Sequence, residues 1–410
     1  MSYLAQIDAA TPAVRWPMLR TWLYAEPLPL FAELRAERPV LVLPELTFCT
    51  RHADCTMILR RQDVFGVDLY QPKQGDYWMA QDDTARHWRE KSIMKAILDF
   101  EDIPAIREWT GQEVAARLKA ANGHIDYVSQ IGRAVPAAMV QHWFGFDGSD
   151  PAALIDWSYW NQQDAFHNQP FDAPGAVSAD EIIAKRKKAG LMMGLYLGKL
   201  IAKRTLAVKL GSEAQDSVSR LLRLCFSDAL KFNLKQVIFN TGGLLIGAVE
   251  TTSHATTNAL EFLMADPARL AAATAAAGDP ASFDGYVHEA LRFHPAFPYF
   301  FRTTHRPAEL AGGTPFATTV SKGTTVLAVT HSAMFDAAGF ANPDAFDPAR
   351  DHSDMFTLGQ GMHECLGRAI ATVMMPEMVR QILLLPGLKA AGAVDKQGSK
   401  VPQKWGLSWG

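Results

Sequence analysis

The feature that most constrains this chain is the segment from Leu358 to Gly367, near its C-terminus. It places one cysteine, Cys365, on a tight loop that runs directly into a predicted helix, Arg368 to Leu385. A thiolate there would lie at the positive end of the helix dipole, where backbone N–H groups are free to donate to its sulfur. Gly359 and Gly361 can take positive φ and let a flat ligand approach the backbone. The segment therefore predicts a metal-binding thiolate, against the alternative of a buried, inert cysteine.

The same segment resembles the haem-binding loop of the cytochrome P450 family, F-G-x-G-x-H-x-C-x-G. Leu358 stands where the family usually has phenylalanine. The positions that match in register are Gly359, Gly361, His363, Cys365 and Gly367. The resemblance implies haem b as the cofactor and Cys365 as the axial ligand of its iron. It also implies that Gly359, His363 and Gly367 bind the cofactor.

Length and composition are those of an ordinary globular protein. The chain has 410 residues, of which 48% are hydrophobic and 20% charged, so it can bury a large core. Size alone would suggest two or three domains. The resemblance instead implies one P450 domain over residues 1–410, mainly α with minor β, with a small β-containing N-terminal portion packed onto a large helical one. A net charge of −3 gives no reason to expect a nucleic-acid partner.

The N-terminus and the cysteines bear on location. Residues Met1 to Trp22 are broken by charges and by Pro12 and Pro17. No stretch reaches the roughly 18 to 20 apolar residues that span a bilayer, so we expect no membrane partner. The four cysteines show no metal-finger spacing. With no signal peptide, they favour a reducing cytoplasm.

Helical periodicity dominates the chain. Two apolar stretches, Val40 to Thr50 and Thr318 to Thr330, predict short strands. Helix with a minor β portion near the N-terminus and after residue 296 is the P450 order of elements. Besides the helix after Cys365, the predicted helices are Ala53–Arg61, Arg86–Asp99, Ile103–Ala121, Ser129–Phe144, Ser178–Leu206, Ala214–Cys225, Asn233–Ala265, Pro267–Ala277 and Ser282–Arg292.

A second motif, Gly247 to Thr252, lies midway along a long apolar helix and resembles the P450 oxygen-activation segment. Thr251 follows Gly247 by four residues, so its hydroxyl can bond back to that carbonyl and loosen the helix. The small residues Gly247 and Ala248 leave space for a diatomic ligand of the cofactor. Glu250 and Thr251 form an acid–alcohol pair suited to proton delivery. The alternative is a threonine that only satisfies a backbone carbonyl.

The third motif is the pair Glu289 and Arg292, which share one helix face. Exposed pairs of this kind contribute little, so the signal is weak by itself. In the P450 pattern the pair is buried and ties its helix to the meander before the cysteine loop. Ala345 stands where the family usually has a third partner, an arginine, and Arg350 is the expected substitute.

A planar, dianionic cofactor needs cations at its edge. His363 matches the family's position in the loop. Arg302 matches a position on the strand after the Glu289 helix, where a guanidinium can bind a carboxylate. The early helix of the family usually reads H-x-x-x-R; here His87 and Lys91 have that spacing, and Arg89 is an alternative. The competing interpretation of each is a solvated charge.

The electron donor is expected to be a separate protein. The chain carries no flavin or iron–sulfur pattern, so ferredoxin with ferredoxin reductase, or an equivalent donor, is the expected partner. Arg86, Arg89, Lys91, Lys95 and Arg368 predict a basic face for it, against the alternative of ordinary solvated surface.

The substrate is expected to be small and hydrophobic. Aromatic residues suit an apolar or aromatic ligand, although they also occur in protein cores. The stretch Asn161 to Gln169 is unusually polar for a lid, so it either contacts polar substrate groups or forms an exposed loop. The aromatic residues in segments that line the pocket in relatives are Tyr70, Tyr77, Trp78, Trp157, Trp160, Phe166, Phe171, Phe297, Tyr299 and Phe300.

Together these motifs predict a haem-thiolate monooxygenase that activates O₂ and inserts one oxygen atom into such a substrate. The motifs do not give its oligomeric state, for which we expect a monomer. Glu250 and Thr251 are its expected catalytic residues. Two alternatives stay open. One is a peroxide-using enzyme of the same fold, a peroxygenase or hydroperoxide isomerase. The other is a non-catalytic haem sensor or carrier.

Overall fold

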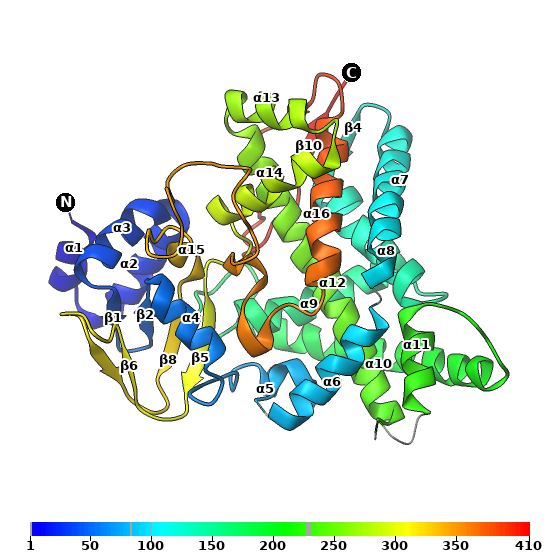
Figure 1. The fold of residues 1–410 in the computed structure, drawn as a ribbon, viewed down its shortest axis with the longest axis horizontal. Coiled ribbons are helices and arrows are strands. Elements are labelled where there is room, and N and C mark those ends of the chain that lie inside the picture. Colours follow the sequence, from blue (N-terminus) through cyan, green and yellow to red (C-terminus); the bar gives the residue numbers. More distant parts are fainter. Residues whose placement is uncertain (1, 83, 99, 227–229, 231) are drawn as a thin grey trace.

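Helices make up most of the computed structural model, which describes residues 2–82, 84–98, 100–226, 230 and 232–410. The N-terminal helices and the larger sheet lie together at one side, and the long helices α12 (Leu234–Met264) and α16 (Arg368–Leu383) cross the rest of the molecule (Figure 1). The expected mainly α fold with minor β is confirmed. No helix of the described residues is long and apolar enough to cross a membrane.

Most predicted helices are present within a few residues of their expected bounds. The early ones are α4 (His52–Arg60), α6 (Thr84–Ile97) and α7 (Ile103–Ala121), followed by the π-helical turn η3 (Val128–Arg133) that leads into α8 (Ala134–Phe144). The later ones are α10 (Ala179–Lys209), α11 (Ser217–Cys225), α13 (Pro267–Ala276) and α14 (Pro280–Phe293). Asp99, the predicted end of α6, lies outside the described residues.

Four further helices of seven or more residues were not predicted. They are α1 (Tyr3–Ala9), α2 (Pro12–Ala25), α3 (Pro27–Glu37) and α9 (Pro151–His167). Three of them begin with proline, which is tolerated in the first turn because its missing N–H would be unpaired there. Proline therefore starts these helices rather than ending them. The remaining short helices and turns are α5 (Gln71–Gln74), α15 (Thr330–Ala333), η1 (Trp78–Ala80), η2 (Phe100–Asp102), η5 (Phe356–Leu358) and η6 (Gly361–His363).

A five-stranded sheet holds one wall of the functional region. Its order is β1-β2-β8-β5-β3, with β2 parallel to β8 and the other neighbours antiparallel. Arg302 on β5 pairs with Val326 on β8, so the sheet fixes the backbone of that arginine. Strands of this sheet are β1 (Val40–Val42), β2 (Thr47–Cys49), β3 (Phe65–Gly66), β5 (Phe300–Thr304) and β8 (Thr325–Ala328). The smaller sheets contain β4 (His124–Asp126), β9 (Lys389–Ala390) and β10 (Gly406–Ser408), and β6 (Ala308–Leu310) with β7 (Thr318–Val320).

Helix α12 is the centre of the helical part. It begins with a capping box, in which Asn233 accepts from the Gln236 backbone and the Gln236 side chain accepts from the Asn233 N–H. Along its length it packs against α8, α9, α14 and α16. This position lets one helix present side chains to several neighbours at once.

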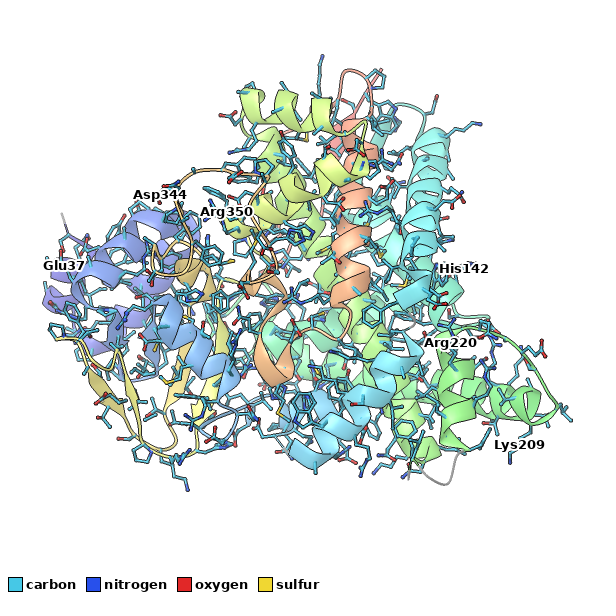
Figure 2. All side chains as sticks on the ribbon, viewed as in Figure 1. Glu37, His142, Lys209, Arg220, Asp344 and Arg350 are labelled. Atoms are coloured by element: carbon cyan, nitrogen blue, oxygen red, sulfur yellow. The ribbon has the colours of Figure 1, made fainter. Side chains whose placement is uncertain are left out.

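The Glu289–Arg292 pair is buried on α14, as predicted. Arg292 donates to both Glu289 carboxylate oxygens at 2.7 and 2.9 Å and to the carbonyls of Met334 and Ala345 at 3.0 Å. Arg350, labelled in Figure 2, lies with its Nε 3.3 Å from Glu289 Oε1, so it is the third partner that the sequence suggested. These contacts fasten α14 to the meander that leads into the cysteine loop.

Candidate active site

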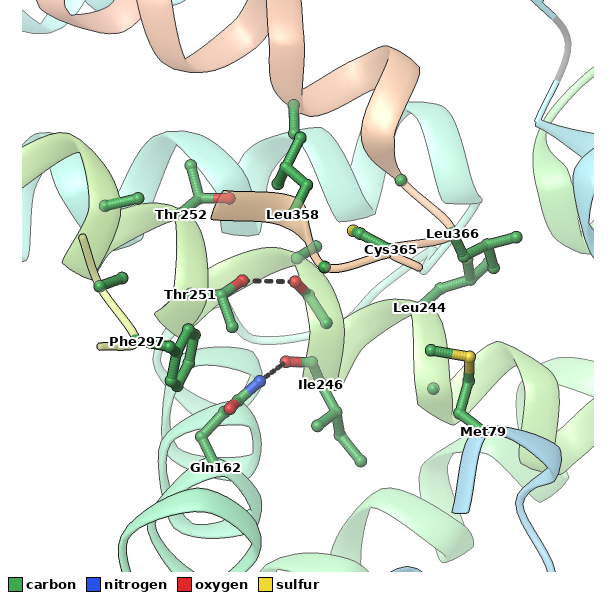
Figure 3. Close-up of a pocket in the computed structure, with 18 of the residues that line it drawn as sticks. Met79, Gln162, Leu244, Ile246, Thr251, Thr252, Phe297, Leu358, Cys365 and Leu366 are labelled. Carbon is green, nitrogen blue, oxygen red and sulfur yellow. Dashed lines mark hydrogen bonds between the residues drawn. The ribbon is translucent and has the colours of Figure 1, made fainter. Parts of the chain in front are cut away.

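A cavity of about 300 Å³ lies between α12, α16, β5 and the loop that precedes α16. Figure 3 shows Cys365 and Leu358 of that loop on one wall, with Thr251 and Thr252 of α12 facing them. Leu244, Ile246, Phe166, Phe297 and Met79 contribute to the other walls, which are mainly apolar.

The loop is shaped by its glycines. Gly359 and Gly361 have φ angles of 71° and 74°, in the left-handed region that glycine enters without strain. A Cβ at residue 361 would also collide with the Leu59 carbonyl oxygen of α4, so only glycine fits there. The Cys365 N–H closes the turn by donating to Leu358 O at 2.9 Å. Both glycines therefore have the positive φ angles that the sequence predicted.

The Cys365 side chain lines the cavity and is half-buried. Burial raises the pKa of its thiol, while the Gly367 N–H and the cations Arg368 and Lys91 act in the opposite direction. A thiolate is therefore unfavourable here unless a further positive charge lies in the cavity. That is the electrostatic setting of a metal ligand.

The α12 wall opposite Cys365 has a notch. Thr251 Oγ1 donates to Gly247 O at 2.6 Å, the bond predicted from their spacing. A Cβ at Gly247 would meet nothing within 4 Å, so the backbone there borders open space. Gly247, Ala248, Thr251 and Thr252 all line the cavity.

Glu250 does not line this cavity. Its carboxylate accepts two bonds from Arg133, at 2.7 and 2.8 Å, and both side chains are buried. Arg133 also donates to Pro402 O at 3.1 Å. Burial raises the pKa of the Glu250 carboxyl, and the Arg133 guanidinium opposes that shift. Successive residues of a helix point about 100° apart, so Glu250 and Thr251 cannot face the same space.

Two buried cationic or ionisable groups border the cavity near the loop. Arg302 lines it, and among the described residues its guanidinium meets the Phe301 carbonyl at 2.8 Å and the Tyr70 hydroxyl, but no carboxylate. Burial lowers the pKa of Arg302. His363 also lines the cavity; its Nε2 lies 3.3 Å from Asp82 Oδ1, and its buried Nδ1 has no partner in the described part of the chain. The Arg302 guanidinium, which has no carboxylate partner among the described residues, fits an anionic ligand edge.

His87 and Lys91 hold the loop rather than line the cavity. His87 Nε2 lies 2.8 Å from Met362 O, and because a carbonyl only accepts, Nε2 carries the proton. Lys91 Nζ donates to Met362 O at 2.6 Å and to Glu364 O at 3.1 Å. Burial lowers the pKa of His87 to about 4 and that of Lys91 to about 8. Arg89 is exposed, because it projects from the face of α6 away from the loop.

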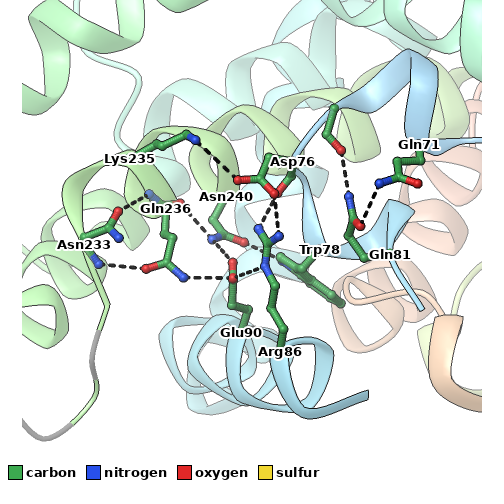
Figure 4. Close-up of polar contacts among 11 residues, drawn as sticks. Gln71, Asp76, Trp78, Gln81, Arg86, Glu90, Asn233, Lys235, Gln236 and Asn240 are labelled. Carbon is green, nitrogen blue, oxygen red and sulfur yellow. Dashed lines mark hydrogen bonds and ion pairs between the residues drawn. The ribbon is translucent and has the colours of Figure 1, made fainter. Parts of the chain in front are cut away.

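A buried polar network keeps α6 in position (Figure 4). The Glu90 carboxylate accepts from Arg86 at 2.8 Å, from Gln236 at 2.9 Å and from Asn240 at 3.0 Å. Trp78 Nε1 donates to Asn240 Oδ1, which adds the segment before α6. The helix that supports the cysteine loop is thus tied to the N-terminal half of α12.

Known proteins resemble this chain in sequence and fold. A protein-family model described as Cytochrome P450 matches residues 283–386, which include the Glu289–Arg292 pair and the cysteine loop. The sequence is 25% identical to cytochrome P450 monooxygenase PikC of Streptomyces venezuelae, over 88% of this chain and 83% of that one. It is 28% identical to erythromycin C-12 hydroxylase of Saccharopolyspora erythraea, over 78% and 77%. The family match thus covers both C-terminal motifs, and each of these two relatives aligns with most of the chain.

Solved structures share the fold across nearly the whole chain. CalO2 aligns with a TM-score of 0.80 at 18% identity, covering 95% of this chain and 97% of that one. Open EryK from S. erythraea aligns with a TM-score of 0.78 at 21% identity, covering 94% and 96%. The chain has the cytochrome P450 fold, and the family match implies a haem cofactor.

The residues around the cavity fit a haem. A thiol whose ionised form needs a nearby positive charge lies on one wall, and the buried Arg302 guanidinium, which has no carboxylate partner among the described residues, lies at the edge. Among the residues predicted to bind the cofactor, those that line the cavity are Gly247, Ala248, Arg302, Gly359, His363, Cys365 and Gly367. His87, Lys91 and Arg89 do not, and the first two instead support the loop backbone.

The aromatic residues predicted to line the pocket fall into two groups, those that line the cavity and those that lie in the hydrophobic cores. Tyr70, Tyr77, Phe166, Phe297 and Phe300 line the cavity. Trp78, Trp157, Phe171 and Tyr299 are buried in the hydrophobic cores, and Trp160 packs beside them. The polar stretch from Asn161 is not an exposed loop, because its first half is the buried end of α9. Residues that the sequence did not single out are Arg133, Ser158 and Asp82, whose partners are distant in sequence.

Proposed function

We propose that Cys365 is the axial ligand of haem b and that this enzyme inserts one oxygen atom of O₂ into a small hydrophobic or aromatic substrate. One observation carries the proposal: the Cys365 sulfur and the notch at Gly247 and Thr251 face each other across one mainly apolar cavity. Residues 1–410 act as one haem domain in this proposal, because the cavity takes lining residues from both the sheet and the helical part.

Each residue then has a defined task. The haem, when bound, supplies the redox chemistry and O–O cleavage that oxygen insertion requires. The Gly367 N–H donates to the Cys365 sulfur and stabilises its thiolate. Arg302 and His363 bind the anionic edge of the cofactor. The apolar walls exclude bulk water, so protons reach the notch through specific side chains rather than from solvent.

Proton delivery is divided between two residues. The Thr251 hydroxyl borders the notch. Its one hydrogen is donated to Gly247 O, so it accepts a hydrogen bond at the notch and gives a proton there by turning away from Gly247 O while its oxygen accepts a replacement proton. Glu250 lies behind it, paired with Arg133, whose guanidinium also contacts the Pro402 carbonyl near the C-terminal strands. We infer that Glu250 supplies Thr251 from this side, which requires the carboxyl to turn from Arg133 or to act through water.

Electrons come from a separate redox partner, and we propose a ferredoxin with its reductase. The predicted basic face is smaller than expected. Lys91 is buried, Arg86 binds Asp76 and Glu90, and Arg368 binds Glu364. Arg89 and Lys95 remain exposed on α6 for an acidic partner. We further propose that the enzyme works as a monomer in a reducing cytoplasm.

The deciding experiment is the difference spectrum of the dithionite-reduced protein with carbon monoxide. A maximum near ~450 nm is expected for a thiolate opposite carbon monoxide. A maximum near ~420 nm in freshly prepared protein, or no haem spectrum after reconstitution, would overturn the proposal. Product formation is then compared with NAD(P)H, ferredoxin, reductase and O₂ and with peroxide alone. Turnover confined to peroxide would assign the enzyme to the peroxide-using class.

A further inference from the structure

The C-terminal half of α9 is polar and yet buried. Asn161, Gln162, Gln163 and Asp164 are 9%, 3%, 5% and 1% exposed. Asn161 donates to Trp157 O of its own helix at 2.8 Å, and Asp164 binds Lys73 and Arg186 outside the cavity. Among these four residues only Gln162 lines the cavity. Its polarity therefore needs an explanation of its own.

The amide of Gln162 is held in one orientation. Its Nε2 donates to Ile246 O of α12 at 2.6 Å. Because a carbonyl oxygen only accepts, the amide nitrogen must face α12 and the amide oxygen Oε1 must point elsewhere. Figure 3 shows the side chain reaching from α9 to the α12 backbone beside the Thr251 notch. Ser158, one turn earlier, contacts both Ile246 O and the Glu250 N–H at 3.4 Å, so it fixes α9 against the same turn.

The Oε1 atom of Gln162 is an acceptor without a partner in the described part of the chain. Among the described residues no group donates to Gln162 Oε1, and this atom is not sealed from the cavity. The neighbouring wall is apolar, with Phe166 and Phe297 in ring contact at 5.1 Å. The nearby Thr251 hydroxyl already donates to Gly247 O. An acceptor without a hydrogen-bond partner in apolar surroundings costs free energy. A ligand with a hydrogen-bond donor removes that cost and should therefore bind preferentially.

We propose that Gln162 is a specificity-determining residue that selects substrates with a hydrogen-bond donor, a hydroxyl or an N–H, on an otherwise apolar or aromatic skeleton. A carbonyl or ether oxygen at the same place would meet the lone pairs of Oε1 and be disfavoured. The hydrogen bond also orients the substrate against the α12 turn that carries Thr251. This inference rests on the proposed function, because it takes the cavity to be the substrate site.

The test uses probes that coordinate haem iron through an imidazole nitrogen. They are 4-phenylimidazole, its three isomers with one ring hydroxyl, and the three matching fluoro isomers, which have similar size and no donor. Dissociation constants are read from the shift of the Soret band. In the parent enzyme at least one hydroxyl isomer binds about 3- to 10-fold more tightly than its fluoro partner, the ratio expected of one neutral hydrogen bond. In Gln162→Leu that ratio falls to about 1 because the acceptor is gone.

Three controls make the result specific. Unsubstituted 4-phenylimidazole keeps its affinity in both proteins, which shows an intact cavity. Gln74→Leu removes another amide that lines the cavity and leaves the hydroxyl-to-fluoro ratio unchanged. Gln162→Met replaces Gln162→Leu if the latter does not load haem. Equal ratios in the parent and the Gln162 variants, with a normal imidazole shift, would overturn this inference alone. Absence of any imidazole shift in the parent would overturn the proposed haem function and this inference with it.

Discussion

Arg133 and Glu250 form a buried, bidentate ion pair. The pair holds the Glu250 carboxylate outside the cavity to which this residue is expected to deliver protons. The pair joins η3 to α12 one residue before Thr251. Glu250 therefore stands between the notch and the C-terminal segment at Pro402. A substitution that keeps the shape of the Glu250 side chain can separate its role in proton delivery from its role in the ion pair.

Glu250→Gln removes the titrating carboxyl and keeps an amide oxygen for Arg133. If Glu250 supplies protons, turnover falls about 100-fold, within the range of a lost acid–base group, and its solvent deuterium isotope effect increases. Steady-state product formation in H₂O and D₂O measures both. A variant with parental turnover and isotope effect would leave the ion pair a purely structural role. The melting temperature reports that role independently.

Thr251→Ala removes the hydroxyl at the notch. We expect NADPH oxidation to continue while reducing equivalents appear as peroxide, because oxygen then lacks an ordered proton donor. Thr256→Ala is the matched control. Thr256 Oγ1 also donates to the carbonyl one turn back, Thr252 O, at 2.9 Å, but Thr256 does not line the cavity. The ratio of product to NADPH consumed distinguishes them. Equal coupling in Thr251→Ala and the parent would remove Thr251 from proton delivery.

Arg292→Ala breaks a buried pair and strips donors from two carbonyls of the segment before the cysteine loop. Such a loss destabilises a protein by about 3 to 5 kcal/mol, and we expect the haem-to-protein ratio of the purified variant to fall severalfold. Arg380→Ala is the control, since Arg380 binds Glu377 with the same spacing and the Ala277 carbonyl, away from that segment. Normal haem loading of Arg292→Ala would contradict the prediction.

Asp164 joins α9 to two other helices, α5 and α10. Its carboxylate lies 3.3 Å from Lys73 Nζ of α5 and 2.9 Å from Arg186 Nε of α10. Asp164→Asn weakens both contacts, so we expect 4-phenylimidazole to associate severalfold faster in stopped-flow mixing. Glu181→Gln, which removes an exposed pair with Lys185 on α10, leaves the rate unchanged. An unchanged rate in Asp164→Asn would show that these elements do not control access.

Local features of the site were predictable and distant ones were not. The turns at Gly359 and Gly361 and the Thr251–Gly247 bond each arise within one short segment, so spacing alone indicates them. The position of Arg89 was open because spacing does not say which face of α6 meets the loop. The structure turns the face with His87 and Lys91 inward.

The missed contacts depend on how helices pack. Arg133 reaches Glu250, and Gln162 reaches Ile246, only because η3 and α9 lie against α12. Helix α9 was itself overlooked, because its polar second half hides the apolar periodicity that marks a buried helix. Those polar residues are stable inside the protein because they bind partners from α5, α10 and α12.

Gln162 and Asp164 lie two residues apart on α9 and so point to nearly opposite sides of it. One faces the cavity and the other fastens the helix to α5 and α10. Because both groups lie on one helix, a substitution that shifts α9 is expected to change the Gln162 contact and the Asp164 contacts together. Ligand selectivity and the rate of ligand exchange would then change together in variants along α9.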